Sequence, residues 1–196
     1  NFVDSKFKEN ADKAQASGLY FGFYHFMSEK TSPTQQAIDF YNTIKGYKYT
    51  LIPCLDIETN NLGRNATQIS DRCIEFLNKF KELSGIDCII YTGGYFGRDN
   101  LDNRVKKYKG WIAHYGVSTP MATGFNVVGH QYSETGKVDG VGGNCDMNNF
   151  NDDILLQKPR QNFKITATAN IEHDGLKNYS GINHILIGTT GQAKRL

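Results

Sequence analysis

The sequence predicts an α/β fold, and specifically an α/β barrel, from three observations. Apolar segments typical of buried strands alternate with segments whose apolar residues recur at helical spacing as far as Gly110. Two carboxylates, Asp56 and Glu58, end one of those strands, at the edge where such barrels place their active sites. After Gly110, short strands follow one another with no room for helices between them. We therefore expect a barrel that begins with βα units and ends with bare strands.

The individual elements are predicted from periodicity and from the residues that end each segment. A first helix runs to about residue 17, because Phe7, Ala11 and Ala14 recur at helical steps and Gly18 follows. An aromatic run over 19–26 reads as a buried strand. The other predicted elements are a helix from Ser32 to Gly46, a strand over 50–57, a helix over 67–84, and strands over 86–92, 111–115, 127–132 and 138–141.

The composition is that of a globular protein and excludes several classes. Of the 196 residues, 39% are apolar and 21% charged, which argues against disorder. The net charge of +2 is too small to indicate nucleic acid binding. No segment approaches the roughly 18 apolar residues of a membrane span, and the chain does not open like a signal peptide. We therefore expect neither nucleic acid binding nor membrane insertion.

The cysteines lie at positions 54, 73, 88 and 145. None is paired at a two-residue spacing and no histidine cluster accompanies them, so no metal site is predicted. Cys54 and Cys88 fall inside apolar strand-like runs, where a free cysteine behaves as a small hydrophobic residue. We expect reduced, buried thiols and synthesis in a reducing compartment.

Asp56 and Glu58 are the candidate catalytic residues. They are two residues apart on a strand, so both side chains leave the same face. Two ionised carboxylates on one face repel each other, and one is therefore expected to keep its proton. A protonated acid beside an ionised carboxylate is the pair that glycoside hydrolysis requires. The alternative is that these acids only cap the helix that follows.

Aromatic and polar residues at the other strand ends favour a sugar-binding mouth. Aromatic faces stack on sugar rings, and fixed amides or hydroxyls orient them. Each residue taken alone is more often part of the core than a ligand, but polar or aromatic residues at the same end of every strand are harder to obtain from packing alone. The candidate substrate-binding residues are Tyr24, His25, Tyr91, Trp111, Tyr115, Gln131 and Tyr132. Asp146, at the end of the last predicted strand, could add a third catalytic carboxylate or could be a turn residue that bonds its own backbone.

These residues fall in blocks that resemble one known family. The blocks, in order, are Gly22-Phe-Tyr-His-Phe26, Pro53-Cys-Leu-Asp-Ile-Glu58, Ile90-Tyr-Thr92, Trp111-Ile-Ala-His-Tyr-Gly116, Gln131-Tyr-Ser133, Gly136-Lys-Val-Asp-Gly140 and Cys145-Asp-Met-Asn148. In this order the set is similar to the glycoside hydrolase family 25 muramidases, which include phage endolysins and bacterial autolysins.

The resemblance implies a flattened, TIM-like β/α barrel with five βα units and three further strands. It also implies a lysozyme that hydrolyses the β-1,4 bond between N-acetylmuramic acid and N-acetylglucosamine. Glu58 matches the family's acid, Asp56 its partner carboxylate and Asp146 a further carboxylate of the site. The substrate's acetamido group would be the nucleophile, and no cofactor or metal is expected.

The implied partner is the peptidoglycan of Gram-positive cell walls. The implied location is the cytoplasm of a bacterial host during synthesis and the cell wall after release. Nothing in the sequence indicates an oligomeric state.

The resemblance also predicts where the barrel begins and ends. The family opens with two strands that have no counterpart here, because Asn1 aligns with the loop after the second. We therefore expect a catalytic barrel over 1–153 that lacks its first two strands, with an open edge along the strand at 19–26. Residues 154–196 are predicted to be a linker and a partial C-terminal module or tail.

Two other functions are compatible with the same residues. A non-catalytic barrel could bind wall glycan without cutting it, and would leave the turbidity of cell walls unchanged. A chitinase-like glycosidase would cut chitin, although the Asp-rich run that usually precedes its acid is replaced here by residues 52–55.

Overall fold

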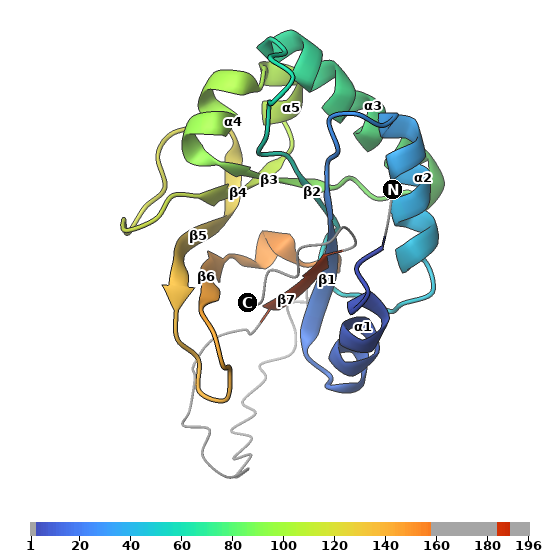
Figure 1. Cartoon of the computed structure of the whole chain (residues 1–196), viewed down its shortest axis with the longest axis vertical. Helices are drawn as coiled ribbons and strands as arrows, with labels where there is room; N and C mark the ends of the chain where they lie inside the picture. The colour runs from blue at the N-terminus through green and yellow to red at the C-terminus, as the bar shows by residue number, and fades with distance from the viewer. Residues whose placement is uncertain (1–2, 158–183, 189–196) are drawn as a thin grey trace.

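A curved sheet of seven strands forms the centre of the protein, and helices cover its outer side (Figure 1). The structure is a computed structural model that describes residues 3–157 and, as backbone, residues 184–188. The elements in chain order are α1 (Phe7–Ala16), β1 (Tyr20–Phe26), α2 (Pro33–Ile44), β2 (Cys54–Asp56), α3 (Ala66–Ser84), β3 (Ile89–Gly93), α4 (Gly94–Asn100), α5 (Asn103–Lys106), β4 (Lys109–Ala113), β5 (Asn126–Gly136), β6 (Cys145–Phe150), the 3-10 helix η1 (Asp152–Ile154) and β7 (His184–Gly188).

The strand order is β6-β5-β4-β3-β2-β1-β7, and every neighbouring pair is parallel except β5 with β6. Parallel neighbours need crossover connections, and α2, α3 and the α4–α5 pair supply three of them. The antiparallel β5–β6 pair needs only a hairpin, which explains why no helix was expected there. The predicted α/β barrel class, with βα units first and bare strands last, is confirmed.

Two apolar clusters cover the two faces of the sheet. The larger cluster packs strand residues such as Phe23 and Leu55 against helix residues such as Phe40 and Phe76. The smaller cluster lies on the inner, concave face. Its members are Tyr24, Leu51, Ile52, Cys54, Ile89, Tyr91, Trp111, Val128, Ile154 and Leu155. Because both faces are buried, the strands read in sequence as continuous apolar runs.

Local chemistry sets the helix ends close to where the sequence predicts them. Ser32 caps α2 by accepting a hydrogen bond from the Gln35 amide. Asn65 and Gln68 form a reciprocal capping box at the start of α3. Gly85 ends α3 with φ of 74°, a left-handed conformation that glycine adopts without steric cost.

Three details differ from the sequence prediction. Residues 138–141 are not a strand but part of the β5–β6 hairpin turn, where the Val141 amide donates to the Val138 carbonyl (3.0 Å). Helices α4 and α5 were not predicted, because a glycine pair was read as a break and each helix is short. The strand predicted over 50–57 is regular only at 54–56, while Leu51 forms an isolated bridge with Leu155.

The expectation of an open edge along β1 is wrong. β7 pairs with β1 in parallel along its length, from Tyr20 opposite His184 to Tyr24 opposite Gly188. Edge pairing needs only the backbone groups of a short extended segment, so few apolar residues suffice for it. The boundary between 1–153 and 154–196 stays a prediction, although one strand of the second segment lies in the same sheet as the first.

The four cysteines are free and buried, as expected. No helix in the described part of the chain is long and apolar enough to span a membrane.

Candidate active site

Asp56 and Glu58 lie at the end of β2 that faces the mouth of the curved sheet. Leu55 and Ile57 belong to the helix-side core, so alternation directs Asp56 and Glu58 to the inner face. Asp56 is 1% exposed, whereas Glu58 is half-buried. The Ile57 amide donates to the Tyr91 carbonyl (3.0 Å), so the backbone stays attached to β3 just past the end of β2.

A hydrogen-bonded trio of side chains lies beside the two carboxylates. Gln131 on β5 is fully buried, and its Oε1 accepts from the Tyr91 hydroxyl (2.7 Å) and from the Tyr115 hydroxyl (2.8 Å). Three consecutive strands or their loops thus converge on one amide oxygen. Within the described residues, Gln131 Nε2 is buried and has no hydrogen-bond partner.

Burial and nearby charges shift the pKa values of the two tyrosines. Burial raises the pKa of Tyr91, and the nearby charges of Glu58 and Asp56 raise it further. Burial likewise raises the pKa of Tyr115, the hydrogen bond with Tyr91 lowers it, and the charges of Glu134, Asp146 and Glu58 raise it. Asp56 is paired in register with Tyr91 across β2 and β3, so it lies next to the tyrosine pair.

Trp111 connects this group to β6. Its ring packs edge-on against Tyr91, with centroids 4.6 Å apart, and its Nε1 donates to Asn148 Oδ1 (2.8 Å). The Asn148 side chain also donates to the Asp146 carbonyl (3.3 Å). Asp146 lies at the start of β6 rather than at the end of a strand. The sequence reasoning missed Asn148 as a site residue, although its two-residue spacing from Asp146 was a usable signal.

Not every predicted site residue joins this group. Tyr24 lies on the inner face, 1% exposed, within the smaller core cluster. His25, its neighbour in β1, points to the helix side. The His25 ring stacks on Phe76, with centroids 5.3 Å apart, and its Nε2 bonds to Gln36 Oε1 (2.9 Å).

Tyr132 is likewise separated from its neighbour Gln131. Adjacent residues of a strand point to opposite faces, and the Tyr132 ring contacts His130, with centroids 6.2 Å apart. Hydrogen bonds and ring contacts thus join Tyr91, Trp111, Tyr115 and Gln131, with Asp56 and Glu58 at the end of the neighbouring strand and Asp146 linked through Asn148. Tyr24, His25 and Tyr132 lie outside this group. In the part of the chain that the structure describes, no group of three or more His, Cys, Asp or Glu residues could hold a metal ion.

Comparison with known proteins assigns the chain to one family. The family model described as "Glycosyl hydrolases family 25" matches residues 1–141. The chain belongs to glycosyl hydrolases family 25. A curated relative, the autolytic lysozyme of Clostridium acetobutylicum, is 37% identical over 155 residues, covering 79% of this chain and 47% of the relative.

Solved structures of this family share the fold. The CTP1L endolysin superposes with a TM-score of 0.68 at 32% identity, over 79% of this chain and 55% of that one. The bacterial lysozyme of Streptomyces coelicolor superposes with a TM-score of 0.67 at 32% identity, over 77% of this chain and 76% of that one. The chain spans about half the length of the first curated relatives it matches, at 47% and 54%.

Proposed function

We propose that this chain carries the muramidase activity of its family, hydrolysing the β-1,4 bond between N-acetylmuramic acid and N-acetylglucosamine in peptidoglycan. The proposal rests on the carboxylate pair Asp56 and Glu58 at the end of β2, where Asp56 is paired in register with Tyr91 of the Tyr91–Gln131–Tyr115 group. The two relatives described above as an autolytic lysozyme and an endolysin support it.

The proposed roles follow from burial and position. Glu58 is half-buried at the rim, where a carboxylic acid can reach the leaving oxygen of a bound glycan and protonate it. Asp56 is almost fully buried beneath it and would stabilise the positive charge that develops at the reacting carbon. The substrate's own acetamido group would attack that carbon, with Asp56 orienting it. Asp146 would add negative charge from the opposite side of the mouth.

The neutral groups would orient the glycan. Tyr115 is 42% exposed and presents a ring face at the rim. Gln131 fixes both tyrosine hydroxyls through one oxygen and retains an unused donor on its nitrogen. Because Gln131 is fully buried, its amide acts on the glycan through the tyrosine hydroxyls that it fixes.

We also propose which cell wall is the substrate and where the chain acts. We expect the substrate to be Gram-positive wall peptidoglycan, reached after release from the cell in which the chain is made.

The test is Glu58→Gln, compared with Glu82→Gln as a matched control on the exposed side of α3. The amide keeps the shape of Glu58 but cannot donate the proton, so the rate should fall by about 10²–10⁴-fold. Glu82 pairs with Lys79 at the surface, and its variant should keep full activity. Mass spectrometry of the released muropeptides identifies the bond that is cut. Near-full activity of Glu58→Gln, or products without a reducing muramic acid, would contradict the proposal.

A further inference from the structure

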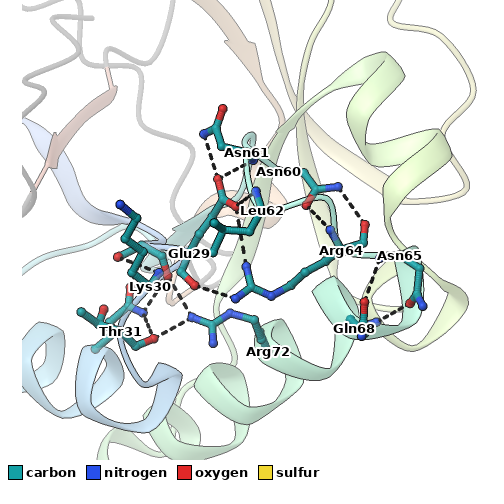
Figure 2. A network of polar contacts seen from close by, with 12 residues as sticks. Glu29, Lys30, Thr31, Asn60, Asn61, Leu62, Arg64, Asn65, Gln68 and Arg72 are labelled. Carbon is teal, nitrogen blue, oxygen red and sulfur yellow. Dashed lines mark hydrogen bonds and ion pairs between the residues drawn. The ribbon is translucent and has the colours of Figure 1, made fainter.

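Two loops that follow neighbouring strands are joined by one partly buried carboxylate. Glu29 lies in the loop after β1, and Asn61 and Leu62 lie in the loop after β2, close in sequence to Glu58 (Figure 2). Glu29 belongs to none of the residue groups that the active site uses. Its side chain is nevertheless only 11% exposed, which is unusual for a glutamate outside an active site.

The Glu29 carboxylate accepts hydrogen bonds from consecutive backbone amides. Its Oε1 accepts from the Asn61 amide (2.8 Å) and from Asn61 Nδ2 (2.9 Å), and its Oε2 accepts from the Leu62 amide (2.9 Å). The Thr59 side chain is a further donor to it. Burial alone would raise the pKa of Glu29, but these hydrogen bonds outweigh burial and lower it. The carboxylate is therefore ionised at neutral pH, when its bonds to the loop are strongest.

Two arginines hold the other side of the junction. Arg64 lies 3.6 Å from Glu29 Oε2 and donates to the Glu29 carbonyl (2.9 Å). Arg72 on α3 donates to the carbonyls of Ser28 (3.0 Å) and Thr31 (2.6 Å), on either side of Glu29. The backbone that carries Glu29 is thus fixed to α3 while its side chain holds the loop after β2.

The loop after β2 is also closed on itself. Asn60 accepts from the Arg64 amide (2.8 Å), and its Nδ2 donates to the Arg64 carbonyl (2.8 Å). Asn65 then begins the capping box of α3. From Asn60 to α3 the chain therefore has anchors at several successive residues, and the Glu29 carboxylate ties this loop to the loop after β1.

We infer that Glu29 is a positioning residue for Glu58: it holds the backbone at Asn61 and Leu62, three and four residues further along, and so keeps the proton donor at the mouth. The inference rests on the proposed function, because it concerns the residue proposed there as the acid. Glu58 lies beyond the regular part of β2, so strand pairing alone does not fix it. Small displacements of a catalytic group are enough to reduce the rate by about 10²-fold.

The experiment compares Glu29→Ala and Glu29→Gln in the full chain, with purified peptidoglycan as substrate. Glu29→Ala should lower kcat by about 10–100-fold and leave KM nearly unchanged, because the glycan-binding residues are not touched. Glu29→Gln keeps one acceptor oxygen but sets an NH₂ group against the Leu62 amide, so its loss of kcat should be smaller.

Rescue by a small carboxylate distinguishes positioning from general damage. Formate can occupy the space that the Glu29→Ala substitution opens, and it can accept the same amide hydrogen bonds. It should raise kcat of Glu29→Ala several-fold, with no effect on Glu29→Gln, in which that space is filled. Sodium chloride at the same ionic strength should do nothing. In Glu29→Ala the Asn61 and Leu62 amides should exchange hydrogen faster than in the wild type, and formate should restore their protection. In Glu29→Gln only the Leu62 amide should exchange faster.

Glu75→Ala is the matched control. Glu75 is also a glutamate that joins two elements, since it accepts from the amide (3.2 Å) and the hydroxyl (2.6 Å) of Thr34, but it does not contact the loop after β2. Its variant should keep kcat and show no formate effect. An active wild type with unchanged kcat in Glu29→Ala, or a loss of kcat that formate does not restore, overturns this inference alone. A wild type that releases no muropeptides overturns the proposed function, and this inference with it.

Discussion

Lowering the pH below 6.5 should destabilise the folded chain through His25. The His25 side chain is 2% exposed, and it lies between the rings of Phe40 and Phe76. Burial lowers the pKa of His25 from 6.5 to about 4, although the Gln36 hydrogen bond and the negative charge of Asp39 oppose this change. The folded chain therefore keeps this imidazole neutral where the unfolded chain protonates it.

The sign and size of the effect follow from proton linkage. Between pH 6.5 and about 4 the unfolded state binds a proton at His25 that the folded state does not bind. The free energy of unfolding therefore decreases as the pH falls through this window, and the contribution is fully present only above pH 6.5. At about 1.4 kcal/mol for each tenfold change in proton affinity, the loss reaches about 3 kcal/mol below pH 4 and about 2 kcal/mol near pH 5.

The matched variant is His25→Phe. Phenylalanine can stack in the same place, and Gln36 Oε1 still accepts from the Ser28 amide (2.7 Å) after the imidazole is removed. Denaturant unfolding of both proteins between about pH 5 and 7.5 gives two stability curves, and their difference removes the titration of groups common to both. The wild type should lose about 2 kcal/mol more than the variant. Equal losses in the two proteins would refute the burial argument.

Two further predictions concern packing and the sheet edge. A methyl group at Gly129 would overlap the Phe150 ring and lie 2.8 Å from Trp111 Cδ1, so Gly129→Ala should lower the free energy of unfolding by about 1–3 kcal/mol. Gly143→Ala, with nothing within 4 Å, should change it little, and denaturant titration compares the two. Deleting residues 184–188 should expose the β1 edge, lower the melting temperature and cause concentration-dependent self-association in light scattering. A monomer with unchanged melting would contradict the β1–β7 pairing.

The fold class could be predicted because the signals that define it are local. Helix periodicity, the Ser32 and Asn65 caps and the Gly85 terminator are all visible in short windows, and α1 to α3 begin and end within a few residues of the prediction. The β1–β7 pair could not be predicted, because it joins segments about 160 residues apart through backbone groups that every sequence has. Helices α4 and α5 are too short to show a full apolar period.

The face on which each site residue lies was the harder problem. In a strand that is polar on one side, alternation identifies the inner face directly. β1 is covered on both faces, so Tyr24 and His25 were both predicted to bind substrate although neighbours must point in opposite directions. The same ambiguity affected Gln131 and Tyr132. Asp56 and Glu58 are two residues apart, so they must lie on the same face of the strand, and the sequence alone could predict that they lie together.

The proposed proton donor Glu58 and its partner Asp56 are held by different parts of the fold, so a substitution in the loop after β2 should affect them differently. Asp56 lies within β2, and its carbonyl accepts from the Met27 amide (2.9 Å) while Ile57 is bonded to β3, so the sheet fixes it. Glu58 is one residue further on, at the start of the loop whose Asn61 amide is held by Glu29. Loosening that loop should therefore displace the donor while the partner stays in place. If the donor moves and its partner does not, kcat should fall while substrate binding stays unchanged. Damage to the sheet would instead alter both kcat and substrate binding.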